Sequence, residues 1–340
     1  MELRELLSAL CAAPSVAGAE DRALAEVNRC APAGLVFERD RPGNFTAVLN
    51  PDAPVGVMLL AHVDKTGCMV TGIDEATGFL RLGAVGSVDA RAFPAQRVTV
   101  YGRRDLPGVV VSTPPHLKKA GDDKKLPPAD KLTVDCGLPY DEIKALVRPG
   151  DRVQLVMPPA MLSEHVFTAP YLDNCAGVAA ALLAAEQCAG RLNVRLELVL
   201  SAQEEVGSRG ATAALNATRC VSAVAIDATF AAYPGIKEAQ CAPMGSGARI
   251  GVSPILDKAL SDRLIKTAKE KNIPYTVEVM GRSTGTDADK IGTAGSGKRA
   301  GLVSIPVRYM HQTVETVDLR DIEAAAALLA AALTDWPADA

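Results

Sequence analysis

Hydrophobic residues recur along the chain at two spacings, and each spacing predicts a different kind of element. Leu3, Leu6, Leu7 and Leu10 are spaced as on one face of a helix, and a second helix is expected after a break at residues 15–20. Three apolar segments of strand length follow, at residues 35–37, 45–49 and 55–61. The third is apolar without interruption, which is typical of a central strand buried on both faces.

The pattern changes between residues 67 and 163. Short apolar segments of strand character are separated there by glycine and proline, at residues 79–82, 97–101, 108–112, 132–134 and 152–157. Residues 118–131 are charged and contain proline, which predicts a loop. Several short strands at this spacing are typical of a small barrel or sandwich. We therefore expect residues 67–163 to form an inserted β-rich domain, with a small β-barrel as its simplest form.

Helices and strands alternate again after Pro170. Helices are predicted near residues 174–187, 207–215, 255–271 and 319–333, and strands near 194–200, 223–226, 275–279 and 301–305. Such alternation indicates a mostly parallel sheet covered on both faces by helices. The predicted fold is thus an α/β domain built from residues 1–66 and 164–340, which the β-rich domain interrupts.

Composition narrows the function classes. A formal net charge of -4 gives no basic excess to attract nucleic acid or an anionic membrane, and 4% aromatic residues leave few platforms for stacking bases. The acidic start lacks a secretory signal, and no apolar stretch reaches the ~18 residues of a spanning helix. Eight cysteines without a Cys-x-x-Cys pair suggest reduced thiols, so a cytoplasmic location is expected.

Polar side chains stand where several predicted strands end. His62 and Asp64 close the apolar segment 55–61, Glu204 and Glu205 follow the strand near 194–200, and Asp227 ends the next strand. His311 lies just beyond the strand near 301–305, and Asp173 opens an alanine-rich helix. Ligand sites in open α/β sheets lie outside the carboxyl ends of the strands, so these residues are expected to converge.

Each of these residues also has an ordinary structural interpretation. Asp173 suits a helix N-cap, and the acidic pair 204–205 suits the first turn of a helix. His62, Asp227 and His311 could each be a strand-end residue hydrogen-bonded to a loop. The convergence of five such groups favours a metal site instead, with His62, Asp173, Asp227, His311 and one acid of the pair 204–205 as ligands.

Imidazole and carboxylate ligands suit zinc, cobalt or manganese. A shared carboxylate such as Asp173 can span two ions held ~3.5–4 Å apart. Adjacent side chains point in different directions, so one of Glu204 and Glu205 could bind metal while the other takes a proton from water. Asp64 could fix the tautomer of His62 or orient another ligand. The remaining histidines, His116 and His165, are interpreted as structural or solvated.

The order of motifs resembles one family, the cytosolic di-metal aminopeptidases that include glutamyl aminopeptidase, deblocking aminopeptidase, the TET peptidases and proteins labelled cellulase M. The resemblance spans nearly the whole chain and is carried by Pro14-Ser15 with Gly18 and Glu20, Gly43-Asn44, Ala61-His62-Val63-Asp64, Pro114-Pro115-His116, Asp135-Cys136-Gly137, Gly150-Asp151, Leu172-Asp173-Asn174, Glu204-Glu205-Val206-Gly207, Gly285-Thr286-Asp287-Ala288 and Ile305-Pro306-Val307-Arg308-Tyr309-Met310-His311.

This resemblance implies a role for each residue. His62, Glu205, Asp227 and His311 would be terminal ligands of two divalent metal ions, Asp173 the bridging ligand, Glu204 the general base and Asp64 a supporting acid. It also implies a cis peptide bond after Asp173, peptide substrates, and an inserted domain that mediates dimers, which assemble into a dodecamer. A hydrolase of another amide, such as an N-acyl amino acid, and a non-catalytic binding protein are the alternative functions.

Two residues depart from the family pattern. Lys65 stands where an acid is usual, and Cys175 stands where arginine or a similar polar residue is usual. Neither change removes an expected ligand or base. Lys65 either attracts acidic side chains of the substrate or points to solvent, and these two interpretations predict different specificities.

Overall fold

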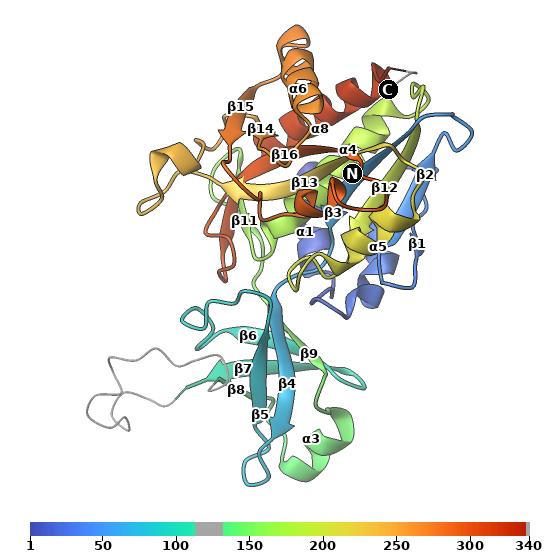
Figure 1. Cartoon of the computed structure of the whole chain (residues 1–340). Coiled ribbons are helices and arrows are strands. Elements are labelled where there is room, and N and C mark those ends of the chain that lie inside the picture. Colours follow the sequence, from blue (N-terminus) through green and yellow to red (C-terminus); the bar gives the residue numbers. More distant parts are fainter. Residues whose placement is uncertain (113–131, 338–340) are drawn as a thin grey trace.

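A computed structural model describes residues 1–112 and 132–337, which form a helix-flanked sheet and a separate barrel (Figure 1). The sheet runs in the order β1-β2-β12-β3-β13-β16-β17-β11-β10, with β14 and β15 attached beside β16. Its strands are β1 (Glu38–Arg39), β2 (Phe45–Leu49), β3 (Gly56–His62), β10 (Ala160–Met161), β11 (Val166–Ala169), β12 (Arg195–Ser201), β13 (Ser222–Phe230), β14 (Ala248–Val252), β15 (Tyr275–Val279), β16 (Arg299–Arg308) and β17 (Glu315–Asp318).

The centre of the sheet is parallel and its margins are antiparallel. β12, β3, β13 and β16 pair in parallel, whereas β2, β17, β11 and β10 add antiparallel strands outside them. Every residue of β3 is buried, because a central parallel strand is covered on both faces. The predicted α/β class is therefore confirmed, but the sheet is mixed where a mostly parallel one was predicted.

Helices cover both faces of this sheet, and the alternation along β3 shows how. Leu59 packs in the cluster that holds α4 and α8, while Met58 and Leu60 point to the cluster that holds α5 and α7. The described helices are α1 (Leu3–Ala12), α2 (Leu24–Cys30), α3 (Tyr140–Leu146), α4 (Leu172–Cys188), α5 (Arg209–Ala217), α6 (Lys258–Glu270), α7 (Ala288–Ile291) and α8 (Leu319–Thr334). Within the described ranges, none is long and apolar enough to cross a lipid bilayer.

Two chain segments connect the barrel to the sheet domain, one leading into β4 and the other leaving β9 (Figure 1). It closes in the order β4-β5-β8-β7-β6-β9 through antiparallel pairs and encloses its own apolar core. Its strands are β4 (Gly67–Ile73), β5 (Leu80–Val85), β6 (Arg97–Tyr101), β7 (Asp105–Val111), β8 (Thr133–Asp135) and β9 (Arg152–Leu155). The loop predicted at residues 118–131, and His116, lie outside the described residues.

One strand prediction is wrong. Residues 35–37 do not form a strand, and strand pairing in this segment begins only at β1. Leu35 and Phe37 are buried beneath α2, but the main chain of Phe37 bonds to the side chain of Asn28 instead of a neighbouring strand. The apolar residues here anchor a loop to the core, which the hydrophobic pattern does not distinguish from a short strand.

Candidate metal centre

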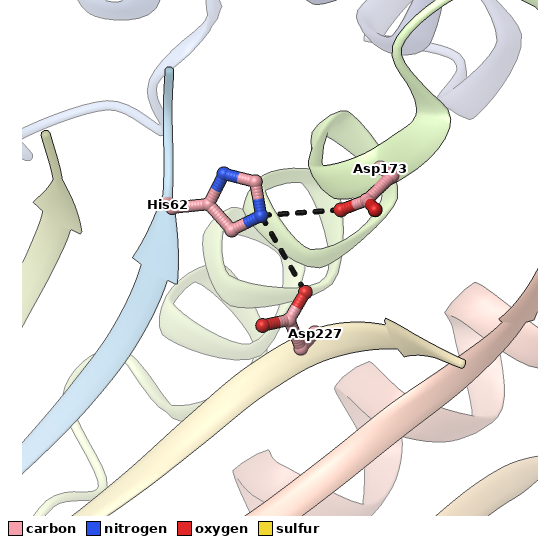
Figure 2. A group of neighbouring side chains, drawn as sticks. All are labelled: His62, Asp173 and Asp227. Atoms are coloured by element: carbon pink, nitrogen blue, oxygen red, sulfur yellow. Dashed lines mark hydrogen bonds and ion pairs between the residues drawn. The ribbon is translucent and has the colours of Figure 1, made fainter. Parts of the chain in front are cut away.

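The five predicted ligands converge at the carboxyl ends of the central strands. His62 is the last residue of β3, and Asp227 lies in the second half of β13. Asp173 stands at the start of α4, and the peptide bond that follows it is cis, as the family resemblance implies. Figure 2 shows His62, Asp173 and Asp227 pointing toward one another from these three elements. Glu205 and His311 come from the loops after β12 and β16.

The ligands form two groups that share Asp173. In the first group, His62 Nε2 lies 3.1 Å from Asp173 Oδ1 and 3.5 Å from Asp227 Oδ1. In the second group, His311 Nε2 lies 3.3 Å from Asp173 Oδ2 and 3.5 Å from Glu205 Oε1. The donor atoms of each group lie within 4.8 Å of one another. Each oxygen of Asp173 thus faces a different group, which is the arrangement that the predicted bridging role requires.

The charged side chains of this cluster are buried, so they need groups of opposite charge nearby. His62 is 2% exposed and Asp227 is 6% exposed, so neither is well hydrated. Burial raises the pKa of Asp227 to about 6, and burial together with the Asp173 charge raises the pKa of Glu205 to about 8. Buried carboxylates are otherwise paired or bind metal. Two divalent ions would supply that positive charge, so the donor set fits the metals expected from the sequence.

The two histidines are surrounded by anions. A hydrogen bond with Asp173 raises the pKa of His311 to about 9. Burial by itself lowers the pKa of His62, but Asp227 and Asp173 raise it above the usual value. Burial likewise opposes ionisation of Asp173, yet His311 and His62 hold its pKa below the usual range. The carboxylates around the two imidazoles thus favour the protonated, cationic form of each ring.

Glu204 lies beside the ligand Glu205 and is not a member of either metal group. Burial raises the pKa of Glu204 to about 8, with the charges of Asp227 and Asp287 also raising it. Nearby cations would lower this pKa, because positive charge favours the carboxylate.

Asp64 supports the loop that carries Glu204 and Glu205. Its Oδ1 accepts a hydrogen bond from the Glu204 amide at 2.9 Å, and its Oδ2 accepts one from the Glu205 amide at 3.1 Å. His62 Nδ1 lies 3.0 Å from the main-chain oxygen of Asp64 but 3.6 Å from its carboxylate. Of the two roles that the sequence left open for the Asp64 carboxylate, orienting another ligand has the shorter contacts.

Two further side chains hold the same loop, and the sequence did not reveal their roles. Asn44 Oδ1 accepts from the Ala202 amide at 2.9 Å, and Glu20 Oε1 accepts from the Gln203 amide at 3.2 Å. Both Asn44 and Glu20 are buried. Four consecutive amides, from residue 202 to 205, thus donate to side-chain oxygens. Motifs seen only as parts of the family resemblance therefore fix the path of the acidic loop.

Glu315 was missed altogether. It is the first residue of β17, is 2% exposed, and lies four residues after His311. Its Oε2 accepts from the Asp173 amide at 2.8 Å, and its Oε1 accepts from the His311 amide at 2.9 Å. The surrounding residues 311–318 are mostly polar and include a second acid, Asp318, so the sequence carries no signal that this acid is buried.

The contacts of Lys65 contradict both interpretations of this residue offered from the sequence. It is 1% exposed, and its Nζ donates to the main-chain oxygens of Leu10 at 2.8 Å, Cys11 at 3.0 Å and Ala13 at 2.5 Å. All three of its N–H donors are therefore used at the C-terminal end of α1. The cation neither points to solvent nor is free to meet a substrate.

The second departure lies in the same buried region. Cys175 is buried in the first turn of α4. A hydrogen bond with Cys11 lowers its pKa and the charge of Lys65 lowers it further, against the opposing effect of burial. The two departures from the family pattern thus lie close enough for the charge of Lys65 to act on Cys175. His165, by contrast, has a side chain that is 42% exposed and belongs to neither group.

Comparisons with known proteins agree with this geometry. The family described as M42 glutamyl aminopeptidase matches residues 43–328. The lysyl aminopeptidase of Pyrococcus furiosus is 33% identical over 326 residues, covering 94% of this chain and 93% of that protein. An aminopeptidase structure from Desulfurococcus kamchatkensis, APDkam598, superposes with a TM-score of 0.91 at 30% identity and covers 99% and 96% of the two chains. The TET1 peptidase of Pyrococcus horikoshii, which assembles into a tetrahedron or a large octahedral shell, gives 0.87 at 27% identity over 98% and 100%.

Proposed function

This chain belongs to the M42 glutamyl aminopeptidase family, and we propose that the two ligand groups sharing Asp173 are its catalytic metal centre. The protein is a metallo-aminopeptidase that hydrolyses N-terminal residues from peptides. The observation that carries the proposal is the division of the Asp173 carboxylate, since one oxygen faces His62 and the other faces His311.

The chain supplies the groups that position and move protons. When bound, two divalent ions polarise the scissile carbonyl and lower the pKa of the attacking water. Glu204 accepts the proton of that water and then delivers it to the leaving amine. Asp64 keeps Glu204 in place, because it binds the Glu204 amide and the neighbouring Glu205 amide at once.

Replacing Glu204 with glutamine tests the assignment of the base. Glu204→Gln keeps the size of the side chain and removes its ability to accept the proton. Both ions should remain bound while kcat falls by about 10²–10⁴-fold, the range of general acid–base catalysis. Metal content is measured on the same samples as hydrolysis of an aminoacyl anilide. Wild-type turnover in the variant would remove Glu204 from this role.

Zinc is the proposed metal, with cobalt or manganese as alternatives, because imidazole and carboxylate ligands suit all three. The substrate side chain is a separate question, since one relative is named for lysyl substrates and the family for glutamyl substrates. A panel of aminoacyl anilides, assayed after reconstitution with each metal, resolves both. Activity that does not depend on any added metal would contradict the proposal.

We also propose that the barrel, which lies within the predicted insertion 67–163 but ends before β10 of the sheet, mediates dimers that assemble into a dodecamer. Relatives in the TET group form dodecamers and larger shells. Val109 and Val156 support a contact here, because these exposed apolar residues line one shallow hollow on the barrel. Light scattering should give a particle much larger than one chain, and Val109→Asp with Val156→Asp should reduce it. A monomeric wild-type protein would exclude this assembly.

A cytoplasmic location is proposed as well. All eight cysteines are free, and most of them are buried. Thiols in this state are typical of a reducing compartment. Fractionation of cells that produce the chain, with activity assayed in each fraction, tests the location.

A further inference from the structure

The backbone that carries the second metal group lacks the support that the sheet gives to the first. His62 ends a strand and is in parallel register with Ser201 of β12, whereas His311 lies beyond β16 in a turn. Tyr309 and His311 have φ values of 65° and 63°, a region that residues other than glycine rarely occupy. Something other than sheet pairing must therefore hold His311 in line with Asp173.

We propose that Glu315 is the positioning residue that joins these two ligands, and that it chiefly maintains the metal position formed by Asp173, Glu205 and His311, because His311 belongs to that position alone. This inference rests on the proposed metal centre. Its carboxylate receives the Asp173 amide on one oxygen and the His311 amide on the other, at 2.8 Å and 2.9 Å. Glu315 thereby fixes two ligands that come from distant parts of the chain.

The chemistry explains why the residue is a carboxylate. A carboxylate offers acceptor oxygens on both of its arms, whereas an amide of the same shape offers one acceptor arm and one donor arm. A glutamine at this position would meet one main-chain amide with its own NH₂ group. In a site that is 2% exposed, water is poorly placed to satisfy the amide left without an acceptor.

Glu315 is itself held firmly. It begins β17, whose four residues are all buried, and it pairs with Ala169 at the end of β11. Its main-chain oxygen also accepts a hydrogen bond from Thr168 Oγ1 at 2.7 Å. The carboxylate therefore extends from a fixed strand toward two ligands on less regular backbone, as a positioning group should.

Zinc binding by Glu315→Gln tests the proposal. Calorimetric titration of the metal-free proteins should find two zinc ions per chain in the wild type. In the variant, one ion should bind as before and the other about 10- to 100-fold more weakly, the usual effect of removing a partner of a metal ligand. Cobalt substitution should show the same selectivity, as loss of one of two sets of visible absorption bands.

Glu197→Gln is the matched control. Glu197 is also a buried carboxylate with two partners, Arg195 and Thr218, but it pairs with Met58 four positions before the His62 end of β3. The Glu197→Gln variant should bind both ions with the affinity of the wild type. If Glu315→Gln does not fold, Glu315→Asp serves instead, because it keeps both oxygens but withdraws them by one methylene.

The outcomes separate the two proposals. Binding of both ions at wild-type affinity by Glu315→Gln would overturn the role of Glu315 and leave the metal centre intact. Equal weakening of both ions would overturn the claimed selectivity. A wild-type protein that binds fewer than two zinc ions would overturn the metal centre and, with it, this inference.

Discussion

The two halves of the candidate site are built in different ways. His62 and Asp227 stand on central parallel strands, where His62 is in register with Ser201 of β12 and Asp227 with Ser304 of β16. Glu205 and His311 stand on loops. His311 itself has a positive φ, and the main-chain amides of the two ligands are held by the carboxylates of Asp64 and Glu315. A ligand on a strand needs little besides the sheet, whereas a ligand on a loop needs a buried acceptor of its own.

Asp173 belongs to both halves, so its loss should have the largest effect. Asp173→Ala should release both ions and lower kcat/KM by at least about a thousandfold, since unbound water keeps a pKa near ~15.7. The assay is metal content together with anilide hydrolysis. Asp141→Ala, at an exposed position on the barrel helix α3, should leave both unchanged. Retention of two ions without Asp173 would show that it does not bridge.

The terminal histidines should separate the halves. His62→Ala should remove the ion bound by His62, Asp173 and Asp227, which we call the strand-borne group. His311→Ala should remove the ion bound by Asp173, Glu205 and His311, which we call the loop-borne group. Each substitution should lower activity by more than the 10- to 100-fold that is typical when a residue hydrogen-bonded to a metal ligand is lost. The metal content of each purified variant should approach one ion per chain. Loss of the same ion in both variants would mean that the groups are not independent.

Asp64→Asn should have a smaller effect, confined to the loop-borne half. An asparagine supplies one acceptor arm where the amides of Glu204 and Glu205 now use two. We expect kcat to fall by about 10- to 100-fold while the ion of the His62 group remains. Steady-state kinetics and metal analysis test this, and an unchanged kcat would show that the loop keeps its path without Asp64.

Metal binding should depend on pH in a direction set by the metal-free site. His311 has a pKa raised to about 9 by Asp173, and Glu205 a pKa raised to about 8 by burial, so both hold protons near pH 7. A bound cation must displace these protons, so affinity should rise with pH until about pH 9, by about tenfold per unit for each proton released. Calorimetry in buffers of different ionisation enthalpy counts the protons. Affinity that is constant from pH 6 to 9 would contradict this.

Lys65 should give the smallest effect on activity, because it lies outside both halves. Lys65→Met leaves three carbonyl oxygens near the end of α1 without their donor, which should cost about 1–3 kcal/mol of the free energy of unfolding. The ratio of kcat/KM for Glu- and Lys-terminated peptides should not change. Urea unfolding and the two assays test this, and an altered ratio would return Lys65 to the question of specificity.

The same contrast explains what the sequence could predict. The apolar run of β3 and the acid in β13 follow rules of period and strand length, so the strand-borne ligands were predictable from pattern. Glu204, Glu205 and His311 were also found, because they follow such strands directly. Glu315, Asn44 and Glu20 were not assigned roles, because a hydrogen bond between distant segments leaves no periodic signal. Lys65 was misjudged for the same reason, since its partners lie in α1.

The most direct test of the account is to locate the metal ions themselves. Crystals of the protein reconstituted with zinc, measured with anomalous scattering at the zinc edge, should show two peaks ~3.5–4 Å apart. One peak should lie between His62 and Asp227, the other between Glu205 and His311, with one oxygen of Asp173 directed at each. A single peak, or two peaks that Asp173 does not join, would contradict the two-ion centre proposed for this aminopeptidase.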